Sequence, residues 1–318
     1  MVEDENAPGI PNGWYAVAWS TDVHPGEVKR IRYFDEELVL FRTRTGAARV
    51  LSAYCPHLGA HLAEGGRVVG ETIRCPFHAW HYDGESGRCV KIPYCERIPP
   101  KARVRKWDVC ERNGMIFVWH HDQQADPDWE VPEASQFADP EWSEVRTFEI
   151  EVPVHVQDMA ENNLDPVHFQ VVHSAVNVPE TEIRWGDDGR FFHAISHSEQ
   201  ETPYGTFKME LLRDTWCIGM SGVESRGIPN VGLYLFSSTS PIDRYNTVSR
   251  WALTATKNMV DTAGEEWFDA ITKGVNDDMR IWANKVHRPD PVLCEGDKLL
   301  AEFRRWTKQF YTRPPEKA

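Results

Sequence analysis

Two short segments of the chain each combine one cysteine with one histidine. Cys55-Pro-His57 is followed, after seventeen intervening residues, by Cys75-Pro-Phe-His78. Two thiolates and two imidazoles could bind a single zinc ion, but zinc fingers usually pair cysteine with cysteine and histidine with histidine. Mixed halves instead suit a two-iron, two-sulfur cluster in which one iron takes both thiolates and the other takes both imidazoles. The pattern therefore favours an iron–sulfur cluster, with zinc as the alternative.

A second candidate metal site lies further along the chain, where His168 and His173 follow Asp165-Pro166. Five residues turn an ideal helix by about 140°, so both imidazoles can reach one metal only if the helix distorts or ends near Ser174. The alternative is that Asp165 simply caps a helix that begins at Pro166, and that the two histidines have no metal to bind.

A carboxylate that could complete this second site is predicted on a helix over residues 264–286. The apolar stripe of this helix spans an arc of about 80° and consists of Trp267, Ile271, Val275 and Trp282. Asp278 falls inside that arc, whereas Asp277 projects away from it and is expected to be solvated. Burying a bare carboxylate costs several kcal/mol, so Asp278 must be protonated, paired or bound to a metal. A salt bridge is the common solution, but two histidines and one carboxylate also form the facial triad of non-haem Fe(II) sites.

The elements that must position these residues differ between the two halves of the chain. Residues 1–12 form a tail, and residues 13–121 alternate short apolar runs with turn signals, which predicts an all-β domain. Residues 122–145 are rich in Asp, Gln, Pro and Glu and are expected to form a connector. Residues 146–318 mix strand-like and helical patterns, which predicts an α+β domain with an antiparallel sheet. The strand-like runs are 146–154, 205–212, 231–237 and 248–256, and the helical segments lie near 156–173, 264–286 and 295–310.

Composition limits the partners of the chain. With 35 Lys and Arg against 49 Asp and Glu, the formal charge is −14, which argues against nucleic acid or an anionic membrane as partner. No apolar stretch approaches the roughly 18 residues of a membrane span, and the acidic N-terminus has no features of a signal peptide. We therefore expect a cytoplasmic protein. The sequence also contains no Gly-x-Gly-x-x-Gly fingerprint after a strand, so NAD(P)H is expected to act only indirectly.

The segments Cys55-Pro-His-Leu-Gly-Ala-His61 and Cys75-Pro-Phe-His-Ala-Trp-His-Tyr82 resemble the two cluster-binding boxes of Rieske proteins. Over nearly its whole length the chain resembles the oxygenase component of Rieske non-haem iron oxygenases, and most closely the ketosteroid 9α-hydroxylase and cholesterol 7-desaturase branch. The segments that carry the branch resemblance are Gly13-Trp-Tyr15, Ile92-Pro-Tyr94, Asp278-Met-Arg-Ile-Trp282 and Arg304-Arg-Trp-Thr-Lys-Gln-Phe-Tyr311. The resemblance implies an N-terminal all-β Rieske domain and a C-terminal, helix-grip-like antiparallel sheet domain that binds the mononuclear iron.

The resemblance also implies the roles of the candidate residues. The [2Fe-2S] cluster would be held by Cys55, His57, Cys75 and His78, and the mononuclear Fe(II) by His168, His173 and Asp278. Asp165 would be the catalytic carboxylate that links His78 to an iron-bound histidine, across a subunit boundary of a homotrimer.

The activity that the resemblance implies is that of a terminal oxygenase. Such an enzyme uses O₂ as co-substrate and receives electrons from a separate reductase, with or without a ferredoxin. The predicted reaction is monooxygenation of a bulky apolar substrate, steroid-like or polycyclic, held by residues between Val176 and Leu253. Desaturation and demethylation are alternatives within the same class. A Rieske electron carrier or redox-sensing module without oxygen chemistry is the alternative outside it.

The cluster boxes also predict a low reduction potential. Respiratory-type Rieske proteins carry an additional cysteine in each loop and a serine that bonds the cluster, whereas Ala60, Phe77 and Trp80 stand in those places here. Fewer hydrogen bonds to the cluster sulfurs would stabilise the reduced state less, which favours the low end of the roughly −150 to +300 mV Rieske range.

Overall fold

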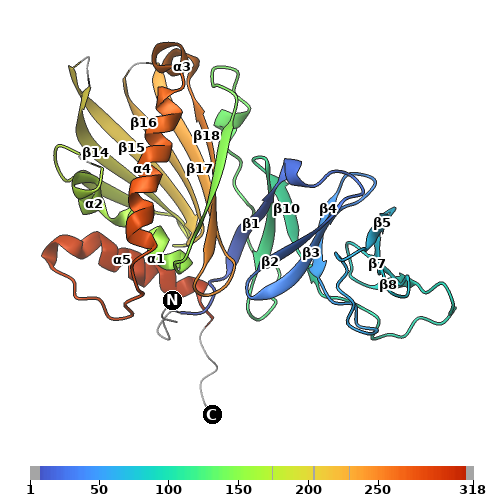
Figure 1. The fold of residues 1–318 in the computed structure, drawn as a ribbon. Helices are drawn as coiled ribbons and strands as arrows, with labels where there is room; N and C mark the ends of the chain where they lie inside the picture. The colour runs from blue at the N-terminus through green and yellow to red at the C-terminus, as the bar shows by residue number, and fades with distance from the viewer. Residues whose placement is uncertain (1–7, 174, 203–204, 229, 313–318) are drawn as a thin grey trace. The chain divides into compact units, whose positions relative to one another are not determined.

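The computed structural model describes residues 8–173, 175–202, 205–228 and 230–312. The chain divides into two compact units. The smaller unit comprises residues 14–131, and the larger comprises residues 132–318 together with the residues before Trp14. Figure 1 labels the strands and helices of both units.

The smaller unit is built from short strands in three sheets. The first sheet has the order β1 (Gly13–Trp19), β11 (Met115–His120), β10 (Val109–Arg112). The second has the order β2 (Val28–Tyr33), β3 (Glu36–Arg42), β4 (Ala48–Ser52), β9 (Lys106–Trp107). The third has the order β5 (Arg67–Val69), β6 (Thr72–Arg74), β7 (His81–Asp83), β8 (Cys89–Lys91). The apolar runs that predicted strands form the buried centres of β3 and β11.

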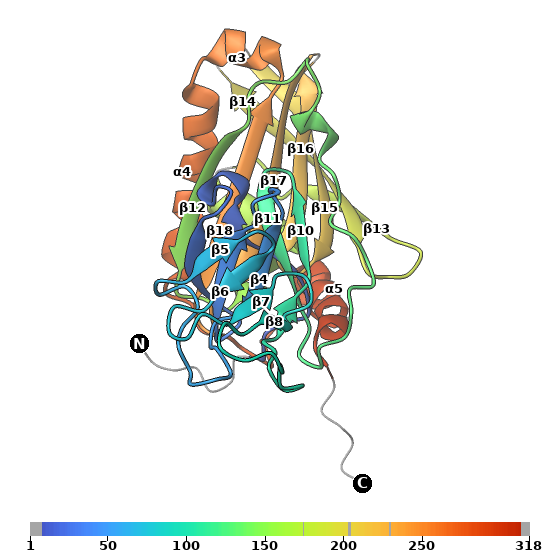
Figure 2. The same ribbon diagram turned by 90° about the vertical axis from the view of Figure 1, so that its right-hand side faces the viewer.

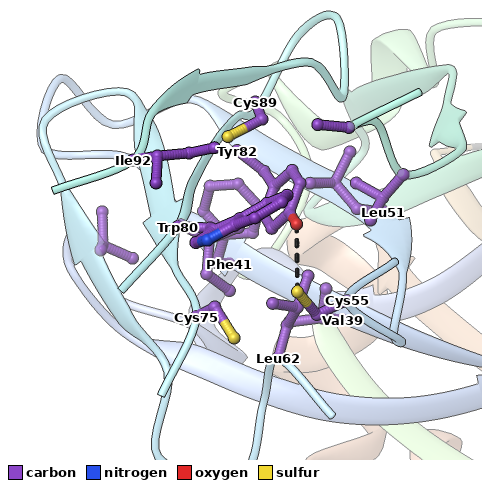
Figure 3. Close-up of a cluster of buried hydrophobic side chains, with 14 residues drawn as sticks. Val39, Phe41, Leu51, Cys55, Leu62, Cys75, Trp80, Tyr82, Cys89 and Ile92 are labelled. Atoms are coloured by element: carbon purple, nitrogen blue, oxygen red, sulfur yellow. Dashed lines mark hydrogen bonds between the residues drawn. The ribbon is translucent and has the colours of Figure 1, made fainter. Parts of the chain in front are cut away.

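The two cysteine–histidine segments lie in the loops between β4 and β5 and between β6 and β7. Both cysteines belong to one buried cluster of this unit. Figure 3 shows them with the apolar side chains Val39, Phe41, Leu51, Leu62, Trp80 and Tyr82. Gly66 closes the first loop, and a Cβ there would lie 1.8 Å from the carbonyl oxygen of Leu62. Both loops are therefore held in place by packing on the same buried cluster.

The larger unit contains a seven-stranded antiparallel sheet. Helix α4 (Glu266–Trp282) lies along one face of this sheet, as Figures 1 and 2 show. The strand order is β12 (Arg146–Val152), β18 (Thr247–Ala255), β17 (Val231–Pro241), β16 (Met220–Ile228), β15 (Gly205–Cys217), β14 (Phe192–Thr202), β13 (Glu180–Trp185). On α4, Trp267, Val275 and Trp282 pack against apolar residues of β12, β17 and β18. The apolar stripe predicted for this helix is thus the face that it buries.

The helical segment expected over residues 156–173 is not continuous. It consists of α1 (Val156–Ala160), a 3-10 turn (Glu161–Leu164) and α2 (Pro166–Val171). The break falls at Asp165, whose backbone is extended (φ −109°, ψ 93°). Proline disfavours the helical conformation of the residue before it, so Pro166 forces a new helix to begin.

The predicted fold class, an all-β unit followed by an α+β unit with an antiparallel sheet, is confirmed. The sheet is larger than the sequence patterns predicted, because β13, β14 and β16 were not among the expected strands. The other helices are α3 (Lys257–Ala263) and α5 (Lys298–Thr307), and a 3-10 turn follows α5 at Lys308–Phe310. In the ranges that the structure describes, no helix combines the length and hydropathy needed to cross a membrane.

Candidate functional site

The four residues of the cysteine–histidine loops separate into an inner and an outer pair. Cys55 and Cys75 are buried in the core, whereas His57 and His78 are partly exposed. The two imidazole rings lie 4.7 Å apart between centroids, at 75° to each other. His57 also stacks on Trp80, with ring centroids 4.5 Å apart and an interplanar angle of 9°. The thiols therefore face the core and the imidazoles face outward.

The Cys75 thiol lies close to the Cys55 thiol, with which it forms a side-chain hydrogen bond. Burial raises the pKa of Cys75, and the neighbouring Cys55 raises it further. The backbone N–H groups of Phe77 and His78 donate to Cys75 and act in the opposite direction. These two donors would remain to support a thiolate bound to a metal.

This arrangement fits a two-iron cluster better than a single zinc ion. At bond lengths of about 2.0–2.3 Å, four tetrahedral ligand atoms lie within roughly 4 Å of one another. Among the described residues, two groups of three or more potential ligands have all their ligand atoms within 4.8 Å of one another, and neither contains a residue of these loops. Paired thiols on one side and paired imidazoles on the other match a cluster that separates its two ligand types.

Tyr82 is a site residue that the sequence analysis missed. Its hydroxyl lies 3.0 Å from Cys55 Sγ, as Figure 3 shows. A ligating thiolate can only accept, so Tyr82 would donate this hydrogen bond. Trp80 makes no such contact, because its Nε1 donates to Tyr94 Oη at 2.7 Å. Among the described residues, the Tyr82 hydroxyl thus lies beside Cys55, although Ala60, Phe77 and Trp80 offer no hydroxyl to these cysteines.

The larger unit brings His168, His173 and Asp278 together. Their potential ligand atoms all lie within 4.8 Å of one another. His173 Nε2 is 3.2 Å from Asp278 Oδ2, and the two imidazole centroids are 5.3 Å apart. Because α2 ends at Val171, His173 leaves the helical path and turns toward His168. The helix thus ends as the two-histidine hypothesis required, while Ser174 lies outside the described residues.

The environment of His168 prepares one ring nitrogen for a metal. Nδ1 lies 2.5 Å from the carbonyl oxygen of Asp165, and a carbonyl only accepts, so Nδ1 carries the proton and Nε2 keeps its lone pair. Burial lowers the pKa of His168, although the nearby Asp278 and Asp165 carboxylates act in the opposite direction. A neutral imidazole is the form that binds a metal.

Asp165 also caps α2. Its Oδ1 accepts hydrogen bonds from the backbone N–H groups of Val167 (3.0 Å) and His168 (3.3 Å), and Pro166 occupies the first helical position. The other carboxylate oxygen lies 3.9 Å from His168 Nδ1. The cap that the sequence suggested as the alternative is present, and it holds the segment that carries both histidines.

The two neighbouring aspartates of α4 differ as the helical pattern predicted. Asp278 is 8% exposed, and its carboxylate faces His173 Nε2 at 3.2 Å. Asp277 instead forms an ion pair with Lys273 at 2.8 Å. Among the described residues, Asp278 therefore does not form the salt bridge to lysine or arginine that was the alternative for it.

The three residues line a cavity of about 690 Å³ between the inner face of the sheet and α4. Met209, Leu211, Leu233, Leu235, Trp251 and Ile271 contribute apolar surface to its wall. A mostly apolar cavity with a few polar groups is typical of small-molecule sites. The residues that line the cavity lie between Met159 and Trp282 in the sequence, which is a wider range than the expected one between Val176 and Leu253.

A second group, His155, Asp158 and His287, also has its potential ligand atoms within 4.8 Å. It does not fit a metal. His155 accepts the N–H of Gln157 at Nδ1, and its Nε2 lies 3.3 Å from a backbone carbonyl oxygen, so both of its nitrogens are used. The ammonium of Lys285 lies 3.7 Å from Asp158 Oδ1 and already supplies positive charge.

Comparison with known families matches both units. Residues 13–107 match the Rieske [2Fe-2S] domain. Residues 118–311 match the 3-ketosteroid 9alpha-hydroxylase C-terminal domain. The solved structures of NdmA from Pseudomonas putida CBB5 with caffeine and of dicamba monooxygenase share the fold. NdmA has a TM-score of 0.77 at 21% identity, over 93% of this chain and 89% of its own. Dicamba monooxygenase has a TM-score of 0.70 at 20% identity, over 94% of this chain and 96% of its own.

Two relatives extend over almost the entire chain. Cholesterol 7-desaturase nvd 1 of Ciona intestinalis is 32% identical over 98% of this chain and 71% of its own length. The probable 3-ketosteroid-9-alpha-monooxygenase, oxygenase component, of Rhodococcus rhodochrous is 32% identical over 94% of this chain and 79% of its own. The predicted enzyme class and cofactors are thereby confirmed. The chain belongs to the Rieske non-haem iron oxygenases, in the branch that contains 3-ketosteroid 9α-monooxygenases and cholesterol 7-desaturases.

Proposed function

We propose that this chain is the oxygenase component of a multi-component system that hydroxylates a bulky, apolar, steroid-like substrate. The observation that carries the proposal is the meeting of His168, His173 and Asp278 on the wall of a cavity of about 690 Å³ with a largely apolar lining. A metal held there would face the cavity, where an apolar substrate displaces water.

In this proposal the two units divide the work. Residues 13–121 form the Rieske domain, residues 122–145 the connector, and residues 146–318 the iron domain, after a tail over residues 1–12. The cluster ligands are Cys55, His57, Cys75 and His78, and the iron ligands are His168, His173 and Asp278. When bound, the cluster supplies electrons one at a time and the iron activates O₂.

The residues of the chain orient and isolate these groups. The Asp165 carbonyl oxygen fixes the His168 ring with Nε2 toward the site. The Asp165 carboxylate is only partly buried, with 35% of its side chain exposed, and can receive a second partner. We assign that partner as His78 of a neighbouring subunit in a homotrimer, so that Asp165 couples the two metal centres.

A separate reductase must deliver the electrons, with or without a ferredoxin. Support comes from the relative of Rhodococcus rhodochrous, whose name designates it an oxygenase component. The sequence of this chain has no dinucleotide fingerprint after a strand, so NAD(P)H would act only through that reductase.

The decisive experiment supplies the holoenzyme with reductase, NADH, ¹⁸O₂ and a 3-ketosteroid, and analyses the steroid by mass spectrometry. The proposal predicts a hydroxylated product that carries one ¹⁸O atom. Reduction of O₂ without any oxidised steroid, in a protein with both metal sites filled, would contradict it.

Desaturation is the second candidate, and the relative named cholesterol 7-desaturase favours it. The same assay separates the two reactions. A desaturated sterol would have lost two hydrogen atoms and gained no ¹⁸O, whereas a hydroxylated one would keep the label.

A further inference from the structure

Arg213 places a buried positive charge in the wall of the cavity. It lies in the middle of β15, between Ala194 of β14 and Val223 of β16, and its side chain lines the cavity wall. The residue is only 3% exposed. Burial lowers the pKa of its guanidinium to about 10, so the group is still a cation at neutral pH.

One end of the guanidinium is held by the neighbouring strands. Nη2 donates to Ser196 Oγ at 2.5 Å, and Ser196 Oγ lies 2.7 Å from Thr181 Oγ1. Thr181 in turn donates to the carbonyl oxygen of Pro179 at 3.3 Å. A chain that ends on a carbonyl orders its protons toward it, so Ser196 donates to Thr181 and accepts from Arg213.

The other nitrogens of Arg213 have no acceptor among the described residues. In the part of the chain that the structure describes, Nε and Nη1 are buried and have no hydrogen-bond partner. The nearby Asp165 carboxylate acts on Arg213 only through space, without an ion-pair contact, and the guanidinium carbon lies 5.2 Å from the Phe169 ring centroid. Lys273, the other lysine or arginine in the lining, is 77% exposed and paired with Asp277.

A buried charge with two unpaired donor nitrogens is costly, because its desolvation is not repaid by a partner. Both nitrogens have almost no accessible surface. A group in the cavity would repay this cost when the guanidinium turns toward it, so that Nε and Nη1 donate to that group. A carboxylate offers both a negative charge and two acceptor oxygens to a planar guanidinium, whereas a neutral hydroxyl or ketone supplies no charge.

We propose that Arg213 binds a carboxylate of the substrate, so that the substrate class is a polycyclic acid with an apolar body and one anionic group. This inference rests on the proposed function and specifies its substrate. The apolar wall would hold the ring system, and Arg213, whose guanidinium lies near the Phe169 ring beside His168, would anchor the anionic group and so fix the orientation of the ring system.

The test is calorimetric binding to the anaerobic holoenzyme of 3-oxochol-4-en-24-oate and of its methyl ester, which has the same ring system without the charge. The wild type should bind the acid about 10- to 100-fold more tightly than the ester, as expected for hydrogen bonds to a charged group. Arg213→Met should bind the acid and the ester about equally. Arg213→Lys should keep part of the preference.

Arg226→Met is the matched control, because Arg226 lies on β16, is exposed and pairs with Glu224 outside the cavity lining. It should keep the wild-type preference. Without ligand, Arg213→Met should melt at or above the wild-type temperature, since it removes a buried, unpaired charge.

Equal binding of acid and ester by the wild type, or an unchanged preference in Arg213→Met, would overturn the inference. If the wild type also hydroxylated neutral 3-ketosteroids, the proposed function would stand without it. Preferential binding of the acid without any oxidation in the presence of reductase and O₂ would instead support the inference and contradict the proposed function.

Discussion

Replacing Lys285 with methionine tests what holds the segment that leads to His168 and His173. The Lys285 ammonium lies 3.1 Å from Glu161 Oε2 and 3.7 Å from Asp158 Oδ1. Arg304 lies 2.6 Å from the other oxygen of Glu161, and His287 lies 3.0 Å from Asp158. The carboxylate of Asp158 in α1 and that of Glu161 in the turn after it are thus paired with basic side chains from two later segments. Lys285 and His287 follow α4, and Arg304 lies in α5.

The expected cost follows from the burial of this group. The side chains of Asp158 and Glu161 are 2% and 7% exposed, whereas Lys285 is 28% exposed. Methionine keeps much of the apolar stem and removes the charge, which leaves an excess of negative charge away from water. Removing one partner of a fully buried pair costs about 3–5 kcal/mol, and the partial exposure of the lysine reduces this to about 2–4 kcal/mol.

Differential scanning calorimetry of the holoprotein measures this loss. For a unit of this size, each kcal/mol shifts the melting temperature by about 2–4 °C, so Lys285→Met should lower the transition of the larger unit by roughly 5–15 °C. The control is Lys273→Met, which removes a pair at i,i+4 with a lysine that is 77% exposed. It should cost no more than about 0.5 kcal/mol. Equal shifts in the two variants would refute the reasoning.

Three further predictions concern individual carboxylates and the cluster. Tyr82→Phe removes the hydroxyl beside Cys55 Sγ. Losing this hydrogen bond should destabilise the reduced cluster by about 1 kcal/mol, which lowers the midpoint potential in a redox titration by roughly 40 mV. An unchanged potential would contradict the hydrogen bond. Asp165→Asn keeps the cap on α2 and removes the charge, so melting and metal content should stay the same while turnover is nearly abolished. Asp165→Ala should in addition lose about 1 kcal/mol of stability, and normal turnover in the asparagine variant would exclude the bridging role. Burial raises the pKa of Asp158, but the hydrogen bond from His287 and a neighbouring lysine lower it more, so its net pKa is below the ordinary value. Its stabilisation is complete above the unfolded pKa of about 4 and is lost as the pH falls through the lower folded value. The gap in melting temperature between wild type and Asp158→Asn should therefore shrink below about pH 4, and a gap independent of pH would count against the pairing.

Much of the candidate site was predictable because its signals are local in the sequence. The cluster boxes place ligands two or three residues apart, and Pro166 marks the point where α2 begins. Asp278 stood out because helical periodicity places it among apolar residues, and the structure buries it there. In each case the geometry follows from the chain immediately around the residue.

Contacts between distant segments were not predictable in this way. The bond between Tyr82 and Cys55 joins residues 27 positions apart, and the group around Lys285 joins α1 to segments more than 100 residues later. Strands β13 and β14 also escaped prediction, because β13 contains few apolar side chains and none that is buried, and most residues of β14 are polar.

Arg213 was predictable in part: its place on a strand face follows from the sequence, but its contacts do not. The period of two in β15 places it on the same face as Met209 and Leu211, so the pattern signals a charge on an apolar face, as the stripe of α4 did for Asp278. The pattern does not show whether the Arg213 guanidinium has a hydrogen-bond partner for Nε and Nη1. That depends on which side chains of β14, β16 and α2 reach the guanidinium, and those contacts follow only from the assembled sheet.

Iron content combined with electron paramagnetic resonance tests the central claim most directly. A cluster of two irons together with one mononuclear iron predicts about three irons per chain in the wild type. Asp278→Ala should contain about two and keep an unchanged Rieske signal after reduction, whereas the neighbouring Asp277→Ala should retain all three. Loss of only the mononuclear iron in Asp278→Ala is the result predicted here. Full iron content in that variant, or a wild type that contains only the cluster, would contradict the account.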